Sequence, residues 1–250
     1  MTAASVLVLL LAGVGAGLAG TVTGLASLVS YPALLAVGLP PLTANVTNTV
    51  ALSCNAIGAA AGSQPELRGQ RSRVVRLGMV CVVGGALGAL LLLVTPAEAF
   101  QRIVPWLIAF ASLLLLARPL VQRERSLADG DRHPVVVAAM FLAAVYAGYF
   151  GAAAGVMMLA LLSAVTTDTH ARVNALKNVI LGMGNATAAI GFAVLGPVSW
   201  TAALPLAAGF FAGGLLGPRI VRRLPGTALR VAIGVLGLAL AVRLGYDAYR

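Results

Sequence analysis

The sequence predicts an all-α polytopic membrane protein built from two inverted-topology repeats, and three observations lead to that fold class. Of the 250 residues, 60% are hydrophobic and only 10% are charged, whereas a soluble domain averages roughly 25% charged residues. The arginines fall in short clusters between long apolar runs, which is the arrangement of cytoplasmic loops under the positive-inside rule. The third observation is that glycines and asparagines of the first half recur at the same spacing in the second.

The net charge of +10 does not indicate nucleic-acid binding, because the basic residues are distributed over several loops instead of forming one patch. The first basic residue is Arg68. A secretory signal needs a basic region ahead of its apolar core, so we expect the N-terminus to be the first membrane segment itself.

The first repeat is expected to cover residues 1–120 and to begin with a glycine-broken apolar run. Residues 5–38 are almost uncharged and far longer than one span requires. We expect two short helices with a break near Gly20, as a re-entrant hairpin or two tilted half-spans; the alternative is one long kinked helix whose glycines allow close packing. Three transmembrane helices should follow, at 42–62, 77–94 and 102–120, joined by a basic loop at 66–76 and a nearly neutral turn at 95–101.

The second repeat is expected to cover residues 134–250 and to follow a cytoplasmic linker at 121–133. It again begins with a glycine-broken pair of segments, at 135–149 and 152–165. After a short polar loop come three transmembrane helices, at 173–194, 200–217 and 227–244. Here the neutral turn comes first, at 191–199, and the basic loop second, at 219–223.

The charges of these loops indicate that the two repeats are inverted. Corresponding loops carry opposite charge character in the two halves, so they should lie on opposite sides of the membrane. The positive-inside rule then places the linker in the cytoplasm and both termini outside, in the plasma membrane. The matching residues are Gly17, Gly20, Gly24, Asn48 and Asn55 in the first half and Gly148, Gly151, Gly155, Asn178 and Asn185 in the second.

The candidate substrate site consists of the polar residues within the spans and the glycines at the breaks. Asn48 and Asn55 are seven residues apart and share one helix face, as do Asn178 and Asn185. Interhelical hydrogen bonding is the alternative role for each asparagine. The full set is Lys177, Asn174, Asn178, Asn185, Asn48, Asn55, Thr47, Gly20, Gly24, Gly151 and Gly155.

Lys177 is the only lysine in the chain, and the position that matches it in the first half is Thr47. A lysine provides a compact and movable positive charge, which would suit a substrate-facing role. The alternative is that Lys177, near the start of its helix, extends its ammonium group to the membrane interface.

The chemistry of the spans favours an anion as the ligand. None of the acidic residues lies deep in a span, where a cation pathway or a proton relay would need one. Amides, hydroxyls, one ammonium group and the ends of broken helices remain, and these suit an anion. We find no catalytic constellation, so the chain is not expected to be an enzyme, and no metal or cofactor is expected. The seven acids are Glu66, Glu98, Glu124, Asp129, Asp131, Asp168 and Asp247.

The run Y-A-G-Y-F-G-A-A-A-G at 146–155 and N-A-L-K-N at 174–178 resemble the sulfite exporter TauE/SafE family of membrane permeases. The resemblance extends over both halves, although the first departs from it with T-V-T-G at 21–24 and with Thr47 in the lysine position. It implies a plasma-membrane transporter of small anions such as sulfite, sulfonates or related organosulfur and carboxylate compounds.

We therefore expect a secondary transporter that works by alternating access, with a passive small-anion channel as the alternative. The expected partners are the anionic substrate and the lipid bilayer. Further copies of the chain, in a homo-oligomer, remain an open alternative.

Overall fold

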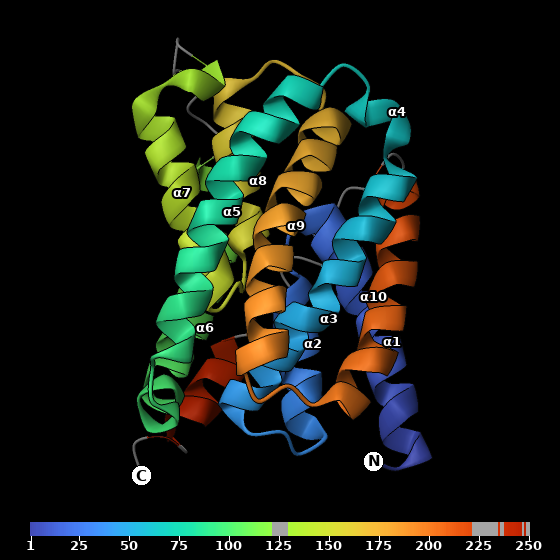
Figure 1. Cartoon of the computed structure of the whole chain (residues 1–250), viewed down its shortest axis with the longest axis vertical. Helices are drawn as coiled ribbons and strands as arrows, with labels where there is room; N and C mark the ends of the chain where they lie inside the picture. The colour runs from blue at the N-terminus through green and yellow to red at the C-terminus, as the bar shows by residue number, and fades with distance from the viewer. Residues whose placement is uncertain (122–129, 222–234, 236–237, 247, 249–250) are drawn as a thin grey trace.

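The computed structural model of the chain describes residues 1–121, 130–221, 235, 238–246 and 248. This part of the chain is helical and contains no β-strand, which confirms the all-α class (Figure 1). Residues 238–246 are helical as well. The elements are α1 (Ala3–Thr23), α2 (Ala26–Ala36), α3 (Pro41–Gly62), α4 (Gln64–Leu67), α5 (Arg71–Leu93), α6 (Ala97–Val121), the 3-10 helix η1 (Gly130–Arg132), α7 (Pro134–Tyr149), α8 (Ala154–Val165), α9 (His170–Leu195) and α10 (Trp200–Val221).

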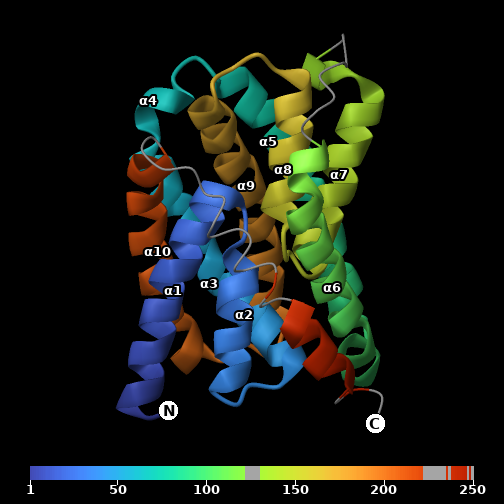
Figure 2. The same ribbon diagram turned by 180° about the vertical axis from the view of Figure 1, so that it is seen from behind.

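The first apolar run forms two antiparallel helices, α1 and α2, and the chain turns between them inside the molecule (Figures 1 and 2). The break between the two helices was expected near Gly20, but this position is wrong, because Gly20 lies in the last turn of α1. The turn is at Gly24, which adopts φ +86° and donates its N–H to the carbonyls of Ala19 and Gly20. A glycine in this left-handed conformation is a common way to end a helix.

The second pair, α7 and α8, turns at the predicted place. Gly151 adopts φ +77° and Ala153 φ +58° between the two helices. The α1–α2 pair opens toward the end of the molecule where the N-terminus lies, whereas α7–α8 opens toward the opposite end (Figures 1 and 2). The turns of the two hairpins meet inside the protein, where Gly24 lies against Gly155.

Five of the described helices are long and apolar enough to cross a membrane: α1, α5, residues Ala97–Leu114 of α6, α9, and residues Trp200–Arg219 of α10. The predicted span at 42–62 forms α3, and the predicted last span at 227–244 lies largely outside the described residues.

The predicted loops are shorter in the structure. Within the expected basic loop at 66–76, α4 ends at Leu67 and α5 begins at Arg71. Three arginines of that loop therefore lie in the first turns of α5. The helix thus begins before the apolar segment predicted at 77–94. The turn at 95–101 is shortened in the same way, because α6 begins at Ala97.

The long helices of each half pack against the other half. α5 packs against α7 and α9, and α10 packs against α1 and α3. Glycines permit this close approach: a Cβ on Gly85 would lie 2.9 Å from Gly184 Cα of α9, and a Cβ on Gly213 would lie 2.9 Å from Gly17 Cα of α1. Small residues at helix contacts are typical of packing in membranes, where the lipid supplies no hydrophobic driving force.

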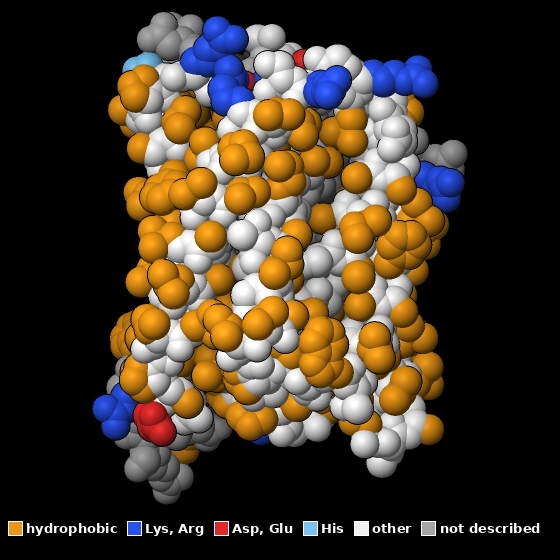
Figure 3. Space-filling view, viewed as in Figure 1, with side chains coloured by type: hydrophobic (Ala, Val, Ile, Leu, Met, Phe, Trp, Pro, Cys, Tyr) orange, Lys and Arg blue, Asp and Glu red, His pale blue; other side chains and the backbone are white. Residues whose placement is uncertain are grey.

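Basic side chains gather at one end of the molecule, above a broad apolar band (Figure 3). At this end Arg73 pairs with Asp131 and Asp168, and Arg76 pairs with Asp131 at 2.8 Å. These ion pairs join the start of α5 to η1 and to the loop before α9. The N-terminus lies at the other end (Figure 1).

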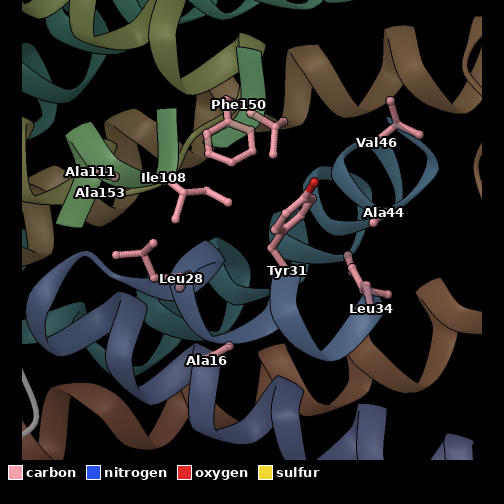
Figure 4. Close-up of a cluster of buried hydrophobic side chains, with 14 of the residues drawn as sticks. Ala16, Leu28, Tyr31, Leu34, Ala44, Val46, Ile108, Ala111, Phe150 and Ala153 are labelled. Atoms are coloured by element: carbon pink, nitrogen blue, oxygen red, sulfur yellow. The ribbon is translucent and has the colours of Figure 1, made fainter. Parts of the chain in front are cut away.

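An aromatic contact joins the two hairpins beside their turns. The rings of Tyr31 in α2 and Phe150, which follows α7, lie 5.5 Å apart in an edge-to-face arrangement. Figure 4 shows both rings within a cluster of apolar side chains. Edge-to-face pairs of this kind add to the stability that burial alone provides.

Candidate functional site

A cavity of about 50 Å³ lies where the turns of the hairpins meet α3 and α9. This volume exceeds the roughly 10–15 Å³ that one water needs, so the cavity is large enough to hold water. Eight of the predicted site residues line it, and they come from both halves of the chain. These are Gly20, Gly24, Asn55, Gly151, Gly155, Lys177, Asn178 and Asn185.

Lys177 enters this region from α9 and is only 1% exposed. Its Nζ donates a hydrogen bond of 3.1 Å to the carbonyl oxygen of Gly20, in the last turn of α1. The C-terminal end of a helix is its negative end, so the ammonium group is placed favourably there. The side chain therefore points into the protein and does not extend to a membrane interface.

Two asparagines of α9 hold the same end of α1. Asn174 Nδ2 donates to the carbonyl of Thr21 at 2.6 Å, and Asn178 Nδ2 donates to the same oxygen at 3.4 Å. The last carbonyls of a helix lack partners within the helix. Residues of the second half thus satisfy the carbonyls at the end of α1 in the first half, and Asn174 does so without lining the cavity.

The end of α7 is held in a related way by a residue that the sequence analysis missed. Asn45 of α3 donates through Nδ2 to the carbonyl of Tyr149 at 2.9 Å. Asn45 is 1% exposed. The sequence shows an asparagine within a span, but the residue of α9 at the same repeat position is Ala175, so Asn45 has no matching asparagine in the second half.

Besides Asn174, two predicted site residues lie away from the cavity. The side-chain amide of Asn48 bonds to Ser27 and Ser30 of α2. Thr47 Oγ1 accepts a hydrogen bond of 3.0 Å from the backbone N–H of Ser199, in the loop before α10. Both residues therefore form hydrogen bonds between elements, which is the alternative role expected for an asparagine such as Asn48.

The remaining asparagines complete the polar wall of the cavity. Asn55 of α3 accepts a hydrogen bond from the Thr21 hydroxyl through Oδ1, at 3.3 Å. Asn185 of α9 is half-buried. Asn55 and Asn185 come from the Asn-bearing helices of opposite halves, and both residues line the same cavity.

Two helix N-termini also meet the cavity. Ala26 and Ser27 begin α2, Ala154 and Gly155 begin α8, and all four line the space. The N-cap residues Leu25 and Ala153 make no side-chain capping hydrogen bond. The N–H groups of a helix start favour an anion, and the residues that line the cavity include no Asp or Glu. In the described ranges no three His, Cys, Asp or Glu side chains come together as a metal site.

Comparisons with known proteins agree with the membrane architecture. The sequence profile of the family described as "Sulfite exporter TauE/SafE" matches residues 9–244. The chain is 26% identical over 245 residues to the "Probable membrane transporter protein ORF9" of Sinorhizobium sp., covering 93% of this chain and 89% of that protein. It is 25% identical over 244 residues to the "Probable membrane transporter protein YfcA" of Escherichia coli strain K12, covering 94% and 87%. No solved structure matches the chain.

Proposed function

Because the chain belongs to the sulfite exporter TauE/SafE family, we propose that it is a secondary transporter that carries a small anion across the plasma membrane. Membership of this family and the apolar helices make the chain a multi-pass membrane transporter protein. The class of substrate and the mechanism are our proposal. Sulfite, a sulfonate or a related organosulfur or carboxylate compound is the substrate class that we infer.

The observation that carries the proposal is the composition of the cavity between the hairpins. Its polar groups are an ammonium group, three asparagine amides and the first turns of α2 and α8. Each of these can donate hydrogen bonds to an oxyanion, and Lys177 can balance its charge. A sulfite or sulfonate group presents oxygens in several directions, which matches donors arriving from α2, α3, α8 and α9.

The arrangement of the helices supports two inverted repeats and alternating access. The hairpins open toward opposite ends (Figures 1 and 2), and α5 contacts α7 and α9 as α10 contacts α1 and α3. Inverted repeats of this kind let one half move relative to the other around a central site. We infer that the substrate binds between the hairpin turns and that each hairpin in turn opens a path to its own side.

The distribution of charge supports an orientation with the basic end in the cytoplasm. The arginines at the start of α5 and the residues of η1 lie at one end of the molecule. Under the positive-inside rule this end faces the cytoplasm, so the N-terminus would lie outside.

Counterflow in vesicles tests the proposal. The purified protein is reconstituted with unlabelled sulfite inside, and uptake of labelled sulfite is compared with uptake into vesicles loaded with chloride. A carrier gives faster uptake when sulfite is present on the opposite side, whereas a passive channel gives equal uptake. If neither sulfite nor a sulfonate nor a small carboxylate enters faster than into protein-free vesicles, the proposal is wrong.

A further inference from the structure

Four helix ends meet at the cavity, and the two halves of the chain supply them in matched pairs. The first half contributes the C-terminal end of α1, at Gly20 and Gly24, and the N-terminal end of α2, at Ser27. The second half contributes the C-terminal end of α7, at Gly151, and the N-terminal end of α8, at Gly155. The C-terminal end of a helix is negative and the N-terminal end is positive, so the partial charges of the four ends largely cancel.

One full charge remains, because the two halves differ at Lys177. Among the residues that line the cavity in the described ranges, Lys177 alone carries a charge, and it is 1% exposed. The matching residue of the first half is Thr47, which lies away from the cavity and accepts a hydrogen bond from Ser199. The site therefore offers a bound anion close to one positive charge.

Part of the cavity wall is apolar. Leu52 and Ala56 of α3 and Leu181 of α9 line the same cavity as the asparagines. Their side chains carry no group that can donate a hydrogen bond to an oxygen atom, whereas burying an apolar group against them is favourable. A cavity of about 50 Å³ admits only a small group of this kind. A ligand with an oxygen on every side therefore fits this lining less well than a ligand that also carries a methyl group.

We propose that the anion bound in this cavity carries a single negative charge and one small apolar group. A doubly charged anion would place one charge inside the protein without a counter-charge, which is strongly unfavourable. Within the class of substrates proposed above, this selects a short alkanesulfonate or carboxylate, and inorganic sulfite meets the charge condition only as hydrogen sulfite. The inference rests on the proposed transport of a small anion and specifies the charge and shape of that anion.

Sulfate and methanesulfonate are a matched pair of probes, because they have nearly the same shape and differ by a methyl group in place of one charged oxygen. Acetate is the third probe, since it is planar but has the charge and the methyl group of methanesulfonate. We measure binding of radioactive methanesulfonate to the purified protein in detergent, with each unlabelled anion as competitor at equal ionic strength. Methanesulfonate and acetate should compete, and sulfate should compete at least about tenfold more weakly than unlabelled methanesulfonate.

A second ammonium group in the apolar wall should change this ranking. Leu52→Lys, at a half-buried position, adds one positive charge to the cavity and should strengthen competition by sulfate relative to methanesulfonate about tenfold. Leu52→Gln is the matched control, because it adds a polar group of similar size without a charge. It should retain the ranking of the wild-type protein.

The binding measurement separates this inference from transport itself. The inference is overturned if sulfate competes as well as acetate does, if methanesulfonate does not bind, or if Leu52→Lys and Leu52→Gln rank the anions alike. Sulfite counterflow without any binding of methanesulfonate would overturn the inference and leave the transport function standing. Binding of methanesulfonate with the expected ranking, but without counterflow of any anion, would overturn the transport function alone.

Discussion

Gly24 and Gly155 meet backbone to backbone at the point where the two hairpins converge. A Cβ on Gly155 would lie 2.5 Å from Gly24 Cα, and a Cβ on Gly24 would lie 2.6 Å from the nitrogen of Val156. Distances this short leave no room for a side chain on either residue. The contact belongs to the wall of the cavity, so the packing of these glycines and the shape of the candidate site depend on each other.

Gly24→Ala is therefore expected to abolish transport. The substitution places a Cβ against the backbone of α8 and forces an alanine to adopt φ +86°, which alone costs about 1–2 kcal/mol. Gly15→Ala is the matched control within α1, because an added Cβ meets no atom within 4 Å. The measurement is sulfite counterflow at equal amounts of inserted protein. Wild-type transport by Gly24→Ala would contradict the close contact of the hairpins.

Lys177→Met is expected to weaken anion binding about ten- to a hundredfold, since a hydrogen bond to a charged group contributes about 1.5–3 kcal/mol. Lys177→Arg should also lose activity, because a planar guanidinium does not replace a point charge in a cavity of about 50 Å³. The concentration dependence of counterflow gives the apparent affinity of each variant.

Ile190→Met serves as the control for Lys177, because Ile190 lies on the same helix and is 68% exposed. It should transport as the wild type does. If both Lys177 variants also transport at the wild-type rate, then Lys177 only satisfies the end of α1, and the anion site is wrongly placed.

The ion pairs at the basic end should make stability depend on pH in the acid range. Burial acts to raise the pKa of Asp131, but the hydrogen bonds and charges of Arg73 and Arg76 outweigh it and hold the pKa below its ordinary value of 3.8. A carboxylate whose pKa is lowered by folding stabilises the folded protein at pH values above its unfolded-state pKa. This stabilisation is lost as the pH falls through the folded-state pKa. The contribution is thus present at pH 6 and decreases below about pH 3.9.

Asp131→Asn tests this expectation through the unfolding temperature in detergent. The variant should unfold at a lower temperature than the wild type near pH 6, and the difference should shrink as the pH falls toward 3. A difference that is constant over this range would show that the carboxylate charge of Asp131 does not contribute.

Labelling of single cysteines tests the orientation. In a protein that carries Cys54→Ala and Cys81→Ala, Arg71→Cys should resist an impermeant thiol reagent in intact cells, and Glu98→Cys should react. Both positions are exposed, so the difference in labelling should depend only on the side of the membrane on which each cysteine lies. Strong labelling of Arg71→Cys in intact cells would contradict a cytoplasmic basic end.

The sequence predicted the class of fold and most helix boundaries, because apolar runs and their polar interruptions are local properties. Pro41–Gly62, Trp200–Val221 and the turn at Gly151 lie close to their predicted places. The turn at Gly24 could not be chosen from the spacing alone, since Gly20 and Gly24 are both glycines in an apolar run. What distinguishes them is the contact of Gly24 with Gly155, which is a tertiary property.

The sequence also predicted only some of the residues of the candidate site correctly. The repeat spacing selected Asn55 and Asn185, and its being the only lysine selected Lys177; all three line one cavity. The spacing could not distinguish these asparagines from Asn48, whose amide bonds to two serines of α2, because both roles require an asparagine facing into the protein. Asn45 was missed because its importance comes from the end of α7, far away in the sequence, and not from a match within the repeat.

The capping of α1 by Lys177 and Asn174 has a consequence for how the protein is made. The ribosome completes α1 long before it reaches α9, so the carbonyls at the end of α1 stay without these partners for the synthesis of about a hundred and fifty further residues. The N-terminal hairpin must therefore remain near the insertion machinery, or at the membrane–water interface, until the C-terminal half has been synthesised. Two fragments divided after Val121 should each be degraded when expressed alone and should persist when expressed together.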